Sequence, residues 1–109
     1  MSAEPSQYVI VMTTCPNDEE AHQLASELVG KRLAACVQAS NIISTYRWQG
    51  AVETAKEVRL FIKARQADYA AVAALILATH SYDIPEVVAI PITAGSRSYL
   101  DWIEAETAR

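Results

Sequence analysis

The sequence predicts an α+β fold in which two helices cover one face of a β-sheet. Two observations lead to this prediction: extended and helical patterns follow in the order strand, helix, hairpin, helix, strand, and the composition is that of a folded chain. The chain has 109 residues, 51% apolar and 20% charged. A chain of this length buries enough surface for one core, so we expect a single domain over residues 1–109 with an N-terminal tail at 1–7.

The first strand and helix are marked by a change of pattern at Pro16. Residues 8–14 are almost all apolar or β-branched, as in a strand buried on both faces. Asn17 and Glu20 then have the spacing of a helix capping box. Apolar residues recur at helical spacing as far as Gly30, a natural helix end. The acidic residues near the start of this helix are interpreted as favourable to its dipole.

The middle of the chain predicts a long hairpin. Residues 34–49 and 52–65 both alternate between two faces, and Gln49-Gly50 lies between them as the turn. Residues 52–65 would extend over roughly 46 Å at about 3.3 Å per residue. A domain of this size has a radius of gyration near 13 Å, about a quarter of that length. We therefore expect the hairpin to project beyond the body.

A second helix, a strand and a short C-terminal helix complete the pattern. Residues 66–80 are rich in Ala and contain no Gly or Pro, which favours a helix. Residues 86–92 form a short apolar strand, and Ser98 is expected to cap the last helix. The resulting order is that of a ferredoxin-like βαββαβ sandwich, with both helices on one face. Its other face and the projecting hairpin need a cover, which predicts a homo-oligomer.

Charge and cysteine content exclude several classes of protein. Nine basic and 13 acidic residues give a net charge of -4, which disfavours nucleic-acid binding. The apolar run at 8–12 is too short for a signal peptide or a membrane span, so we expect a cytoplasmic protein without membrane contact. Cys15 and Cys36 are a single pair of cysteines, too few for a disulfide framework, and are expected to be free thiols.

Four segments together resemble the CutA family of divalent-cation tolerance proteins. They are Arg32-Leu-Ala-Ala-Cys-Val37, Tyr46-Arg-Trp-Gln-Gly50, His80-Ser-Tyr-Asp-Ile-Pro-Glu86 and Ser98-Tyr-Leu-Asp-Trp-Ile103. The resemblance implies a CutA-like, PII-like subunit that forms a homotrimer, with each hairpin paired to a neighbouring sheet. It also implies a role in tolerance of copper and other divalent metals, without an enzymatic reaction or an organic cofactor.

Cys15, His80 and Glu86 are the candidate ligands of a divalent metal ion. If the last strand lies beside the first, Cys15 at the end of one approaches Glu86 at the start of the other, and His80 leads into the same strand. Sulfur and imidazole ligands favour copper. We expect weak binding that falls at low pH, because His80 must be deprotonated. Family members with a metal-associated cysteine place it slightly earlier, where Thr13 stands here.

Three other functions remain open at this point. An enzyme would need a nucleophile and a base, for which Cys15 and His80 are the only candidate pair. An RNA-binding module would need aromatic residues on the open sheet face, where Phe61 is nearly alone. The main alternative is a PII-like trimeric sensor or signalling scaffold that binds a small molecule between subunits. For His80 and Glu86, the alternatives to metal binding are a helix cap and a solvent-exposed side chain.

Overall fold

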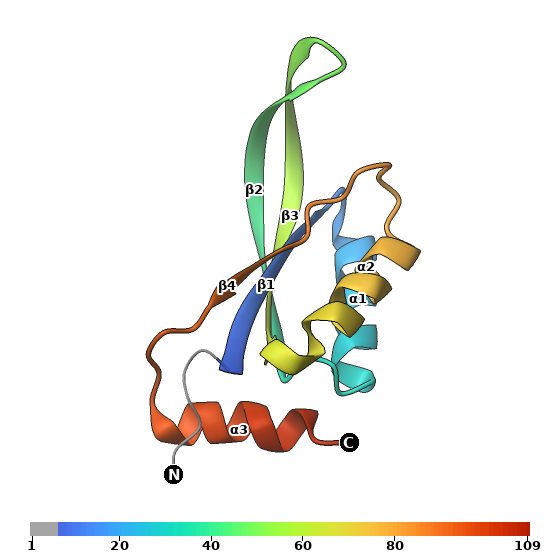
Figure 1. The fold of residues 1–109 in the computed structure, drawn as a ribbon. Coiled ribbons are helices and arrows are strands. Elements are labelled where there is room, and N and C mark those ends of the chain that lie inside the picture. The colour runs from blue at the N-terminus through green and yellow to red at the C-terminus, as the bar shows by residue number, and fades with distance from the viewer. Residues whose placement is uncertain (1–6) are drawn as a thin grey trace.

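A computed structural model describes residues 7–109 and has a four-stranded antiparallel sheet with three α-helices (Figure 1). The predicted tail at 1–7 lies outside the described residues except for Gln7. The strand order is β2-β3-β1-β4, as expected for the ferredoxin-like arrangement. The elements are β1 (Tyr8–Cys15), α1 (Asp18–Gly30), β2 (Cys36–Trp48), β3 (Ala51–Arg65), a 3₁₀ turn η2 (Gln66–Asp68), α2 (Tyr69–Thr79), β4 (Val88–Pro91) and α3 (Arg97–Thr107).

Helices α1 and α2 lie together on one face of the sheet (Figure 1). Their apolar side chains, including Leu24 and Ile76, pack with Val11, Leu60 and Ile62 of the two central strands, and all of these are at most 5% exposed. Alternate residues of β1 and β3 therefore point into this core. Burial of these side chains supplies the main stabilisation of the fold.

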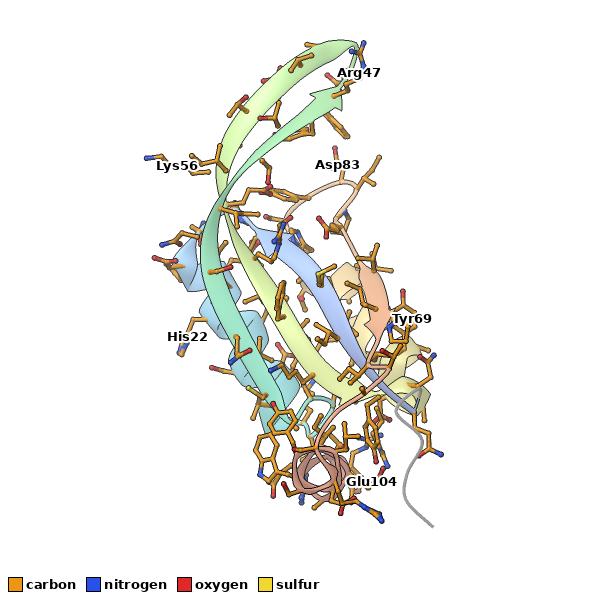
Figure 2. All side chains as sticks on the ribbon, turned by 90° about the vertical axis from the view of Figure 1, so that its left-hand side faces the viewer. His22, Arg47, Lys56, Tyr69, Asp83 and Glu104 are labelled. Carbon is orange, nitrogen blue, oxygen red and sulfur yellow. The ribbon has the colours of Figure 1, made fainter. Side chains whose placement is uncertain are left out.

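The hairpin of β2 and β3 projects beyond the body of the sheet. β1 pairs with β3 only from Cys15↔Val58 to Tyr8↔Arg65, whereas β2 and β3 pair as far as Trp48↔Ala51. The outer half of the hairpin thus has no further strand beside it, and Arg47 marks its far end in Figure 2. The longest dimension of the molecule is 51 Å against 25 and 22 Å, so the predicted projection is confirmed.

The sheet face opposite α1 and α2, called the open face below, carries several apolar side chains and is only partly covered. Strand registers place the residues of this face in two adjacent rows, one with Gln38, Phe61, Met12 and Val88 and the next with Cys36, Lys63, Ile10 and Ile90. Val88 and Ile90 are 45% and 47% exposed. A soluble chain rarely leaves such a face uncovered.

Helix α3 covers one end of the open face. Leu100 and Ile103 pack on Tyr8, with Ala35 and Ile92 at the edge of this small cluster. Ser96 caps the helix by accepting a hydrogen bond from the Tyr99 N–H at 3.3 Å. The predicted cap, Ser98, instead lies inside the first turn, because the helix begins earlier than the apolar pattern indicates.

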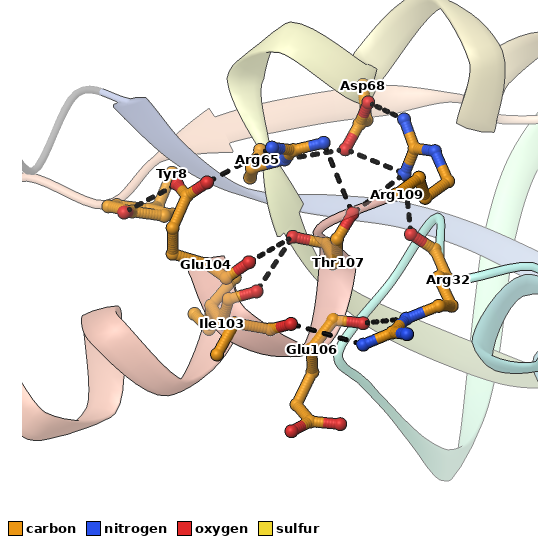
Figure 3. Close-up of polar contacts among 10 residues, drawn as sticks. Tyr8, Arg32, Arg65, Asp68, Ile103, Glu104, Glu106, Thr107 and Arg109 are labelled. Atoms are coloured by element: carbon orange, nitrogen blue, oxygen red, sulfur yellow. Dashed lines mark hydrogen bonds and ion pairs between the residues drawn. The ribbon is translucent and has the colours of Figure 1, made fainter.

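Arginines fix the C-terminal end of α3 (Figure 3). The carboxylate of Asp68 is 7% exposed and accepts hydrogen bonds from Arg65 Nε at 2.9 Å and Arg109 Nη2 at 2.6 Å. Arg32 Nε donates to the carbonyl of Glu106 at 3.0 Å, one of the groups that a helix end leaves unpaired. Cations are also favourable at this end of the helix dipole.

Two predicted elements are shorter than expected. The helix expected at 66–80 begins with η2 and becomes α-helical only at Tyr69. The strand expected at 86–92 is confined to Val88–Pro91, because its ladder with β1 ends at Met12↔Val88. None of the helices in residues 7–109 is long and apolar enough to cross a membrane.

Candidate functional site

Cys15 ends β1 and is completely buried. Pro16 follows and stops the strand, and the Asn17 side chain then caps α1 by accepting the Glu20 N–H at 2.8 Å. The strand therefore leads directly into the helix start, with the thiol between them. Burial raises the pKa of Cys15 to about 11, with smaller contributions from the Glu20 and Glu57 carboxylates. The thiol is protonated at neutral pH.

Glu20 lies in the first turn of α1, where the helix places its carboxylate near the end of β1. Its Oε2 atom accepts a hydrogen bond from Ser81 Oγ at 3.1 Å and lies 3.9 Å from His80 Nδ1. The backbone half of the predicted capping box is confirmed by the Asn17–Glu20 bond. The Glu20 side chain instead faces the loop after α2.

His80 follows the last residue of α2 and turns its ring inward, with 1% of the side chain exposed. Its Nε2 atom lies 2.6 Å from the carbonyl oxygen of Thr14. A carbonyl can only accept, so Nε2 carries the hydrogen and Nδ1 has the lone pair. Nδ1 accepts the backbone N–H of Tyr82 at 3.1 Å. The ring thus joins α2, β1 and the next loop, rather than capping helix carbonyls.

Among residues 7–109, Cys15, Glu20 and His80 form a group whose possible ligand atoms all lie within 4.8 Å of one another. The structure therefore brings together two of the three residues predicted as ligands. Glu86 is exposed in the loop before β4 and is not part of this group. Sequence reasoning missed Glu20, although its capping-box position was a signal that it lies near the end of β1.

Tyr82 and Glu57 link this group to the base of the hairpin. Tyr82 Oη donates to Glu57 Oε2 at 2.8 Å, and the ring centroids of Tyr82 and His80 are 4.6 Å apart. Burial and the Glu57 carboxylate raise the pKa of Tyr82 above its ordinary range. Burial alone would raise the pKa of Glu57, but hydrogen bonds from Ser44, Tyr82 and Thr14 lower it overall. Glu57 therefore stays charged as an acceptor.

An acidic groove of about 330 Å³ runs beside the group, between α1 and the end of α2. Glu19, Glu20 and Glu27 line it together with His80. Such a concentration of carboxylates attracts cations. A second, wider hollow of about 710 Å³ lies at the hairpin base, lined in part by Asp18, Ile42 and Lys56.

Comparisons with known proteins agree with this fold along nearly the whole chain. Residues 9–106 match the family described as CutA1 divalent ion tolerance protein. The chain is 42% identical over 100 residues to "Protein CutA, chloroplastic" of Arabidopsis thaliana, covering 91% of this chain and 55% of that protein. It is 40% identical over 99 residues to "Divalent-cation tolerance protein CutA" of Thermus thermophilus, covering 90% of this chain and 96% of that protein.

The solved structures give the same result. The structure of CutA from Synechococcus elongatus matches with a TM-score of 0.93 and 31% identity, covering 99% of this chain and 96% of that one. The chain spans little more than half the length of the two plant relatives it matches, 55% and 56%. Both sequence and fold nevertheless lead to one conclusion: this chain belongs to the CutA1 divalent ion tolerance family.

Proposed function

We propose that this protein contributes to divalent-cation tolerance by binding metal ions, copper first among them, at Cys15, Glu20 and His80. The observation that supports the proposal is the convergence of sulfur, carboxylate and imidazole ligand atoms within 4.8 Å from three separate segments. Sulfur and nitrogen ligands favour copper over magnesium or calcium. The relative from Thermus thermophilus is named for divalent-cation tolerance, which fits this chemistry.

The three ligand atoms suit a cation, but two of them must change before they can bind one. The Cys15 thiol must lose its proton, and burial opposes this by raising its pKa to about 11. The Nδ1 lone pair of His80 faces Glu20 but is used by the Tyr82 N–H. These two costs support weak rather than tight binding. Glu86, the carboxylate expected from the sequence, is kept as the alternative third ligand.

The same proposal includes a homotrimer. The outer half of the hairpin lacks a neighbouring strand, and β2 and β4 are both edges of the sheet. Pairing the long edge of one copy with the short edge of the next is a head-to-tail contact that can close into a ring. On the open face, Arg59 Nε is buried without a hydrogen-bond partner among the described residues. An unpaired buried donor is unfavourable, so assembly would be favoured if the Arg59 side chain turned outward to an acceptor on a neighbouring copy.

We further propose a cytoplasmic protein without catalytic activity. Cys15 and Cys36 are free thiols, as is usual in a reducing compartment. The candidate nucleophile, Cys15, is fully buried and its pKa is raised. A reactive cysteine needs the opposite environment, with partial exposure and a lowered pKa.

Calorimetric titration of the metal-free protein with copper(II) at neutral pH tests the metal site. We expect saturable binding that is lost in His80→Ala and unchanged in His22→Ala, which alters the exposed histidine on α1. Light scattering on each variant checks that the assembly size is unchanged. Loss of binding in Glu86→Ala would make Glu86 the third ligand.

Absence of saturable heat in the wild type would refute the metal site. The hollow at the hairpin base would then be the next candidate, as the small-molecule site of a PII-like sensor. Stabilisation by a metabolite in the presence of a chelator, detected by thermal shift, would support that second function.

A further inference from the structure

The loop at residues 81–87 connects α2 to β4 and is attached at its start to the candidate metal ligands. Ser81 Oγ donates to Glu20 Oε2 at 3.1 Å, and the Tyr82 N–H donates to His80 Nδ1 at 3.1 Å. The same two acceptor atoms face each other across 3.9 Å. The first two residues of the loop are thus hydrogen-bonded to the atoms that would hold a cation.

At His80, accepting the Tyr82 N–H and ligating a cation exclude each other. The Nε2 atom carries the hydrogen that is donated to Thr14, so Nδ1 has the ring's only available lone pair. That lone pair cannot accept the Tyr82 N–H and ligate a cation at the same time. At Glu20 the competition is partial, because a carboxylate oxygen has a second lone pair.

Tyr82 also connects this loop to the hairpin. Its hydroxyl donates to Glu57 at 2.8 Å, and Glu57 lies one residue beyond the last β3 residue that pairs with β1. Residues of the hairpin beyond this point pair only with each other. In Figure 2, Asp83 marks this loop, next in sequence to the residue whose hydroxyl reaches Glu57. A displacement of the Tyr82 backbone is therefore transmitted through its side chain to the hairpin base.

We propose that residues 81–87 form a cation-released strap: loading of Cys15, Glu20 and His80 frees the Tyr82 N–H, and the Tyr82–Glu57 bond carries the change to the hairpin. This inference rests on the proposed metal binding and adds its regulation. It gives the chain a way to report occupancy of a buried site to the surface where copies would meet. The hydrogen bonds that a cation would replace are both present in the structure: Tyr82 N–H to His80 and Ser81 Oγ to Glu20.

Amide hydrogen exchange of the full chain, followed by NMR with and without the diamagnetic ion zinc(II), tests the strap. At concentrations that calorimetry shows to be saturating, we expect the Tyr82 amide to exchange roughly tenfold faster, since it loses its partner. Amides of α1 and β1 should be protected or unchanged, because a ligand stabilises the folded state. Faster exchange at the Tyr82 amide, while the amides of α1 and β1 are protected or unchanged, would be specific to release of the strap.

The outcomes separate this inference from the proposed function. Saturable binding with an unchanged or slower Tyr82 amide overturns the strap and leaves the metal site intact. Absence of binding heat for both copper(II) and zinc(II) refutes the metal site, and the strap with it. In Tyr82→Phe, which keeps the N–H but removes the hydroxyl, loop release should persist while exchange at Lys56 and Glu57 no longer responds. A persistent response there would refute the transmission step.

Ser81→Ala supplies an independent test, because it removes a competitor for Glu20. We expect copper(II) affinity to rise by about threefold, with the net value of one lost hydrogen bond as the limit. Ser98→Ala, on the exposed side of α3, is the matched control and should bind as the wild type does. Unchanged or weaker binding in Ser81→Ala would contradict the competition at Glu20.

Discussion

The carboxylate of Glu20 lies 3.9 Å from Nδ1 of His80, although one residue begins α1 and the other follows α2. The antiparallel placement of the two helices on one sheet face brings these ends together beside the end of β1 (Figure 1). Because His80 donates from Nε2 to Thr14, the atom that faces Glu20 is the lone-pair nitrogen. A cation between them would therefore meet two acceptors rather than an ion pair.

Glu20→Gln is expected to weaken copper(II) binding by about tenfold or more. The substitution replaces the negatively charged carboxylate of the ligand group with a neutral amide. Glu19→Gln is the matched control: Glu19 lines the same groove but is not part of the group. Its change should lower affinity by less than about threefold, through the weaker field in the groove. Calorimetry at constant ionic strength measures both. Equal losses in the two variants would indicate attraction by the groove alone.

Copper(II) or zinc(II) binding should release close to one proton from Cys15 at pH 7. Burial raises the pKa of this thiol to about 11, so the proton is present at neutral pH and must leave when sulfur becomes a ligand. Affinity should accordingly rise by about tenfold per pH unit from this group alone. Titrations in buffers of different ionisation enthalpy measure the release. A heat that is independent of the buffer, or equal proton release in Cys15→Ser, would exclude the thiol as a ligand.

The sequence predicted the fold better than the site for a physical reason. Alternation at Val58, Leu60 and Ile62 records which face of β3 is buried, and the Asn17 cap and Gly30 mark the ends of α1. These are local patterns with a fixed period. The sequence could place Cys15 and His80 close together because one lies at the end of a strand and the other at the end of a helix.

The third ligand could not be read from such patterns. The approach of Glu20 depends on the path of the loop at 81–87, which contacts Glu20 and Glu57 through individual side chains. Nothing periodic in the sequence encodes those contacts. The capping-box position of Glu20 indicated only that the residue lies near the end of β1. The helix-dipole explanation of its charge was sufficient by itself, so the sequence did not indicate a role as a ligand.

Asp68→Asn should lower the free energy of unfolding by about 2 to 3 kcal/mol at pH 7, because it leaves two arginines without their shared, nearly buried carboxylate. Burial would raise the pKa of Asp68, but hydrogen bonds from Arg109 and Arg65 outweigh it and lower the pKa. A lowered pKa in the folded state gives stabilisation that is present above the ordinary carboxyl value of 3.8 and is lost as the pH falls below it.

Urea unfolding at one protein concentration and several pH values measures this effect. The difference between wild type and Asp68→Asn should shrink on acidification. Asp101→Asn, which changes an exposed carboxylate of α3, should remain within about 0.5 kcal/mol of the wild type. A difference that is constant with pH would assign the loss to packing rather than to charge.

Ile90→Asp should separate the proposed homotrimer into single chains. Ile90 is 47% exposed on the open face, where it is in register with Ile10 of β1. A charge there would be desolvated if a neighbouring copy covers the face, at a cost large enough to prevent association. In the isolated chain the same side chain reaches solvent, so the fold should survive, which circular dichroism can check.

Leu77→Asp is the matched control for this change. Leu77 is 58% exposed on α2, on the other side of the molecule from the open face. The two substitutions therefore remove similar apolar area and add the same charge on opposite sides of the sheet. Light scattering should give a trimer mass for wild type and Leu77→Asp and a single-chain mass for Ile90→Asp. Dissociation by Leu77→Asp with Ile90→Asp intact would move the contact between copies to the helical side.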